Sequence, residues 1–140
     1  MTLTDRNLEA QLNRLAIVGP LPPRPGGVSV QTQSLAQAWR SEGLDVAVVN
    51  TDLPALRRVP MVGRLLLPLV QPLALACRLL RQTGGCQLVH VHASSYWGFM
   101  PVVVAAFLKS LLGWRLVVTY HGHQAAPFLA RHGAWVKRIL

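Results

Sequence analysis

Two adjacent glycines, Gly26 and Gly27, follow a proline-rich loop and stand directly before an amphipathic pattern. Glycine has no Cβ, so its backbone can approach a ligand closely, and the first amides of a helix attract anions. We therefore expect the amides of Val28 and Ser29 to face a phosphate or a sugar. The spacing fits neither the dinucleotide-binding fingerprint nor the ATPase P-loop, and a tight turn without a ligand is the alternative for such a pair.

Histidines near the ends of two apolar runs form a second candidate group. His121, followed by Gly122, stands where an imidazole can donate a hydrogen bond to a sugar hydroxyl or a phosphate and can change its protonation near neutral pH. The alternative is a histidine that ends the strand and bonds a backbone carbonyl, and His123 is a further candidate. His90 and His92 share one face of a strand. Their spacing suits a metal, but no third ligand follows nearby, so we expect both to be satisfied by protein groups and expect no metal.

Apolar runs and helical patterns alternate along the chain, and these elements must position the candidate residues. The apolar runs predict four buried strands, at residues 15–19, 46–50, 87–92 and 115–120. The other periodic segments predict helices at residues 28–42, 64–82, 99–112 and 128–140. Prolines predict irregular structure at residues 51–63 and a kinked or late-starting helix after it.

Near-continuous apolar strands separated by helices require a parallel sheet covered on both faces. The predicted fold class is therefore α/β, a Rossmann-like three-layer sandwich with a mostly parallel sheet. Ligands of such sheets bind beyond the carboxyl ends of the strands. The loops at those ends, where we expect the site, span residues 19–27, 93–98 and 121–124.

Composition limits the chain to one folded unit. Its 140 residues are 51% hydrophobic and 14% charged, which argues against disorder and leaves no room for a second full domain. We expect a polar lead-in at residues 1–14 and one domain at residues 15–140. The two cysteines, Cys77 and Cys86, have no metal-ligand spacing and predict neither a disulfide framework nor a zinc site.

The charge is unevenly distributed. The formal net charge is +9, yet all five acids precede residue 53, and the basic residues after it are dispersed among apolar ones. This pattern favours an anionic membrane surface over nucleic acid as a partner, with a basic solvated face as the alternative. The polar N-terminus lacks a secretory layout, and the apolar window at residues 65–77 is too short to span a bilayer. We expect a cytoplasmic protein, with peripheral attachment to the inner face of the membrane as an option.

Several motifs occur in an order that resembles the N-terminal domain of a family 4 glycosyltransferase of the GT-B fold. The resemblance covers about residues 15–140. The matching motifs are Gly19-Pro20-x-Pro22-Pro23-x-x-Gly26-Gly27-Val28-Ser29, Leu35-Ala36, Gly43-x-x-Val46, Val89-His90-Val91-His92 and Val117-x-x-Tyr120-His121-Gly122.

The resemblance implies a retaining transfer of a sugar from a nucleotide-sugar to a lipid-linked or cell-envelope glycan acceptor. It places the donor phosphates and the acceptor against Gly26 and Gly27, and the transferred sugar against His121. It implies no metal or other cofactor, which agrees with the missing Asp-x-Asp motif. The basic, apolar stretch at residues 56–81 fits docking to a membrane, and a core helix that exposes arginines is the alternative.

The family's second, nucleotide-binding domain, with its Arg/Lys pair and Glu-x7-Glu element, is not identifiable in these 140 residues. We therefore expect a truncated chain that is inactive without the missing C-terminal domain. A non-catalytic module that binds a nucleotide or a sugar phosphate is the alternative function. A nucleic-acid binder is less compatible, because the tryptophans lie in or beside helical segments instead of exposed strands.

Overall fold

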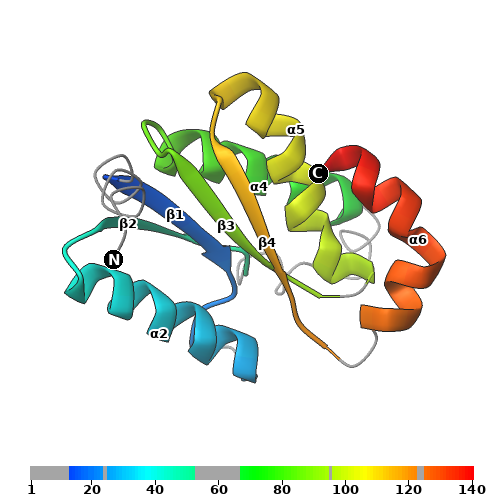
Figure 1. The fold of residues 1–140 in the computed structure, drawn as a ribbon, viewed down its shortest axis with the longest axis horizontal. Helices are drawn as coiled ribbons and strands as arrows, with labels where there is room; N and C mark the ends of the chain where they lie inside the picture. The colour runs from blue at the N-terminus through cyan, green and yellow to red at the C-terminus, as the bar shows by residue number, and fades with distance from the viewer. Residues whose placement is uncertain (1–12, 24, 53–66, 95, 123–124) are drawn as a thin grey trace, which may run out of the picture.

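The computed structural model describes residues 13–23, 25–52, 67–94, 96–122 and 125–140. Its centre is a sheet of four parallel strands in the order β2-β1-β3-β4 (Figure 1). The strands are β1 (Arg14–Gly19), β2 (Asp45–Asn50), β3 (Leu88–Ala93) and β4 (Arg115–Tyr120). The predicted α/β, Rossmann-like fold with a parallel sheet is confirmed, and each predicted strand lies within one residue of its observed bounds.

Helices cover both faces of the sheet (Figure 1). They are α2 (Gly27–Ser41), α4 (Leu67–Gln82), α5 (Met100–Leu112) and α6 (Ala125–Ile139), with a 3-10 helix η2 (Tyr96–Phe99) before α5. Glycines end two of the helices: Gly43 has φ 86° after α2, and Gly113 caps α5 with φ 70° and an amide that donates to the carbonyl of Lys109. A left-handed backbone at these positions favours glycine because it has no Cβ.

Two sequence-based boundaries differ from the structure by more than one residue. The segment expected as a loop at 93–98 begins inside β3 and contains most of η2. Helix α6 begins at Ala125, three residues before the predicted start, because a proline is tolerated in the first turn and Pro127 does not delay the helix. The predicted irregular segment at 51–63 and the start of the predicted helix at 64–66 lie largely outside the described residues.

The core has two parts, one on each face of the sheet. On one face α2 packs on β1 and β2 through Ile17, Ala36 and Val46. On the other face the larger cluster joins β1 and β3 to α4, α5 and α6, with Val89, Val91 and other residues fully buried. Because side chains of a strand alternate, His90 and His92 share the α2 face of β3.

Helix α4 is fixed to the carboxyl end of β2 by one arginine. Arg78 Nη1 donates to the carbonyl oxygens of Asn50, at 2.8 Å, and Asp52, at 3.2 Å. The amide of Thr51 in turn donates to the carbonyl of Gly19, at 3.0 Å. These bonds hold the loops that follow β1 and β2 beside each other, at the end of the sheet where a ligand is expected.

Candidate functional site

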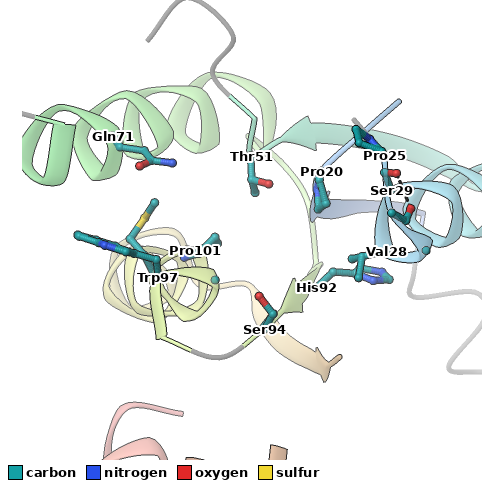
Figure 2. A pocket seen from close by; sticks show the side chains of 15 residues that line it. Pro20, Pro25, Val28, Ser29, Thr51, Gln71, His92, Ser94, Trp97 and Pro101 are labelled. Atoms are coloured by element: carbon teal, nitrogen blue, oxygen red, sulfur yellow. Dashed lines mark hydrogen bonds between the residues drawn. The ribbon is translucent and has the colours of Figure 1, made fainter. Parts of the chain in front are cut away.

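A cavity of about 320 Å³ lies at the carboxyl ends of β1 and β3 (Figure 2). The chain leaves β1 toward α2 on one face of the sheet, and leaves β3 toward α5 on the other. Open parallel sheets bind their ligands at such a point of divergence. The lining residues are Pro20, Pro25, Gly26, Gly27, Val28, Ser29, Thr51, Gln71, His92, Ala93, Ser94, Trp97, Gly98, Met100 and Pro101.

The N-terminus of α2 forms one wall of this cavity. Gly26 has φ 139°, a backbone conformation that residues with a Cβ rarely adopt, and Gly27 begins the helix. Gly26 provides no side-chain cap, and the first turn contains no acidic residue. The Ser29 hydroxyl is buried and donates to the carbonyl of Gly26, at 2.7 Å. The glycine pair therefore presents the positively polarised end of a 15-residue helix to the cavity.

The turn after β3 forms the opposite wall. The amide of Ser94 donates to the carbonyl of Gly98, at 3.1 Å. A Cβ on Gly98 would overlap the Ser94 side chain, so this close turn requires glycine. Trp97 on η2 and Gln71 on α4 face Pro20 and Ser29 across the cavity (Figure 2).

Two pairs of side chains join β3 to β4 beside the cavity. His92 Nδ1 lies 2.8 Å from His121 Nε2, and their ring planes differ by 5°. His90 Nε2 lies 2.7 Å from Thr119 Oγ1. In the parallel register of β3 and β4, His92 lies opposite Thr119, and His121 follows Thr119 by two residues. The register thus brings His92 and His121 close together.

Burial keeps these imidazoles neutral. His92 is 4% exposed, and desolvation, followed by the charges of His90 and His121, lowers its pKa from 6.5 to about 4. Desolvation also lowers the pKa of His90, with a contribution from His121, and the pKa of His121. At neutral pH this row of histidines therefore acts through hydrogen bonds without adding positive charge.

The predicted site residues divide into two sets. Gly26, Gly27, Val28 and Ser29 all line the cavity. His121 and Gly122 do not, and His121 reaches the cavity only through its bond to His92. Gly122 has φ 125°, which favours glycine in the turn that the His-Gly pair forms. The carbonyl of Gly122 accepts a hydrogen bond from the amide of Ala125, at 3.3 Å. His123 lies outside the described residues.

Sequence reasoning missed His92 as a residue of the site. The expectation that protein groups satisfy His90 and His92 holds for their bonds to Thr119 and His121, but His92 Nε2 has no partner among the described residues, and His92 also lines the cavity. The signal for His92 is its position at the carboxyl end of a strand, which is the same signal that indicates His121. No group of three or more potential metal-ligating side chains is found within the described ranges.

An apolar groove of about 650 Å³ adjoins the cavity. The two share Trp97 and Met100, so these side chains separate a polar compartment from an apolar one. Among the described residues that line the groove, all but His132 are apolar or aromatic: Pro72, Tyr96, Trp97, Phe99, Met100, Val103, Val104, Phe128, His132 and Trp135.

Helices α4 and α5 expose further large apolar side chains. Leu69 and Leu73 on α4 are each 67% exposed, and Phe107 and Leu111 on α5 are 74% and 70% exposed. Exposed apolar area of this kind marks a contact surface for lipid or protein. No helix in the described part of the chain has both the length and the hydrophobicity to cross a membrane. Both cysteines are free, and Cys77 is exposed whereas Cys86 is buried.

Comparison with known proteins gives one family. The model of the family described as Glycosyltransferase Family 4 matches residues 25–140. The match includes the glycine pair, the histidine row and every helix described above. No curated protein matches the sequence.

Proposed function

The chain belongs to glycosyltransferase family 4, and from this premise we propose that it forms the acceptor-side half of a retaining glycosyltransferase. The enzyme transfers a sugar from a nucleotide-sugar to a lipid-linked or cell-envelope glycan acceptor. The amides after Gly26 and Gly27 hold the donor phosphates. His121, which lies beside the cavity and is bonded to His92 in its wall, contacts the transferred sugar at the cavity's edge. A second domain supplies most of the nucleotide contacts, so these 140 residues alone do not catalyse transfer.

The observation that carries the proposal is the cavity at the carboxyl ends of β1 and β3, where the connections to α2 and α5 leave on opposite faces of the sheet. It combines the N-terminus of α2, which has no side-chain cap, with a buried, neutral histidine, and none of the described residues that line it is acidic. Such a wall favours anionic oxygens by backbone donors and helix dipole together. Hydrogen-bonding side chains such as Thr51, Gln71 and Ser94 suit the hydroxyls of a sugar.

The apolar groove supports a lipid-linked acceptor. It shares Trp97 and Met100 with the polar cavity, so an acceptor with a polar head and a hydrocarbon chain has a compartment for each. The exposed apolar side chains of α4 and α5 add a surface for a bilayer. With no acid between residues 53 and 140, the dispersed arginines and lysines favour anionic lipid.

Phosphate recognition is tested with inorganic pyrophosphate and the ¹⁵N-labelled chain. We expect the amide resonances of Gly27 and Val28 to shift on titration. Gly27→Val adds a side chain where a Cβ meets no neighbour within 4 Å, so it should leave the fold intact and weaken binding by about tenfold or more. Gly84→Val is the matched control, because its Cβ also enters open space but outside the cavity. Shifts at other amides alone, or equal affinities for the two variants, would contradict the proposal.

Transfer is tested by incubating the chain with a panel of nucleotide-sugars and measuring the released nucleotide. We expect no release, because in this proposal a second domain supplies most of the nucleotide contacts. Turnover by the chain alone would refute the need for a second domain. Tight binding of a nucleotide-sugar without turnover would favour the alternative, a non-catalytic binding module.

Membrane attachment is tested by flotation with vesicles that contain or lack anionic lipid. We expect the chain to float with anionic vesicles and Phe107→Ser to reduce the floating fraction. Val30→Ser is the matched control, since Val30 is 59% exposed on α2, away from the groove. Flotation that is independent of lipid charge, or equal loss in both variants, would contradict docking through α4 and α5.

A further inference from the structure

The bond between His92 and His121 contains a single proton. His92 Nδ1 and His121 Nε2 are 2.8 Å apart, so one nitrogen must donate and the other must accept. Both imidazoles are neutral at pH 7, because burial lowers the pKa of each ring. The direction of this bond therefore fixes the tautomer of both rings at once.

The second ring nitrogen of His92 decides the direction. His92 Nε2 is buried and has no hydrogen-bond partner among the described residues. If His121 donated, the neutral His92 ring would carry its proton on Nε2 and bury an N–H without an acceptor. Buried N–H groups without a partner are rarer in proteins than buried acceptors without a donor. The proton of His92 is therefore favoured on Nδ1, where it meets His121.

We propose that His92 is a positioning residue whose Nδ1–H donates to His121 Nε2 and so holds His121 as the tautomer that offers Nδ1–H to the substrate. This inference rests on the proposed contact of His121 with the transferred sugar. A ring that offers N–H can donate to a sugar oxygen or to a phosphate oxygen. It cannot take a proton at that atom, so His121 serves as a donor and not as a general base.

The neighbouring pair supports a role that is specific to His92. His90 lies on the same face of β3, and its Nε2 is paired with Thr119 Oγ1 at 2.7 Å. Its ring contacts Trp39 on α2, with centroids 5.7 Å apart. His90 thus fills the interface between the sheet and α2, whereas His92 both lines the cavity and contacts His121.

The proposal is tested by long-range ¹H–¹⁵N correlation spectra of the chain labelled at histidine, at pH 7 and without substrate. Neutral tautomers differ by a large ¹⁵N shift between the protonated and the unprotonated ring nitrogen. We expect protonated Nδ1 and unprotonated Nε2 for both His92 and His121. A protonated Nε2 on His121 in the unmodified chain would overturn the proposal, whatever the variants do.

Three variants separate positioning from packing. His92→Leu removes the donor, and we expect His121 to move to the Nε2–H tautomer, which a free imidazole favours. His92→Asn, whose side-chain amide nitrogen replaces imidazole Nδ1, should keep His121 protonated on Nδ1. His90→Gln is the matched control and should leave the His121 tautomer unchanged. An unchanged tautomer in a folded His92→Leu chain would refute the inference, and because no substrate is used, this result would leave the transferase proposal intact.

Discussion

Acidification is expected to destabilise this chain through His92. The ring is buried with a pKa of about 4, against 6.5 for an unperturbed histidine. The unfolded chain therefore binds a proton at a higher pH than the folded chain does. Stability contributed by the neutral ring is complete above pH 6.5 and decreases as the pH falls toward 4.

The size of this effect follows from the shift in pKa. A change from 6.5 to about 4 corresponds to a loss of about 3 kcal/mol between these pH values. The lowered pKa values of His90 and His121 act in the same direction. Because small domains are stable by only about 5–15 kcal/mol, such a loss is a large part of the total.

Urea unfolding at a series of pH values from 7.5 to 4 measures the effect. We expect the free energy of unfolding of the unmodified chain to fall more steeply than that of His92→Asn, which cannot titrate at this position. His132→Asn is the control, since it removes a histidine of α6 that belongs to neither pair and should leave the steep dependence unchanged. Parallel curves for the unmodified chain and His92→Asn would refute the reasoning.

Two further predictions concern the supports of the site, and both are measured by urea unfolding. In Gly19→Ala the new Cβ would lie 2.6 Å from Thr32 Oγ1 in a fully buried contact, so we expect a loss of about 1–3 kcal/mol, whereas Gly84→Ala, in open space, should change stability by less than about 0.5 kcal/mol. Equal losses would show that the contact relaxes without strain. Arg78→Met removes two bonds to backbone carbonyls and should cost about 1–3 kcal/mol, while the exposed Arg81→Met on the same helix should cost little. An Arg78→Met chain as stable as Arg81→Met would mean that packing alone fixes α4 to β2.

The sequence predicts the layered fold because its signals are local. Each strand is a short apolar run, and glycine ends α2 and α5 where a left-handed backbone is needed. The start of α6 was placed late, because nothing local shows that Pro127 sits inside a first turn. Likewise, η2 shows no periodic pattern over its four residues.

The candidate site was only half predictable. The glycine pair at the start of α2 is a local signal, and both glycines line the cavity together with Val28 and Ser29. The apolar groove was not predicted, because α4, η2, α5 and α6 must pack together before its side chains meet. Within any single helix, these apolar side chains follow the same pattern as ordinary core residues.

What the sequence determined by itself is the order of the elements and the backbone freedom at Gly26 and Gly122. Only the tertiary structure decided that His92 lies against His121, because residues 29 positions apart meet through the register of two parallel strands. It also decided that His121 stands beside the cavity without lining it. Burial, which sets the pKa of His92 near 4, is a property of the packed layers and not of any segment of the chain.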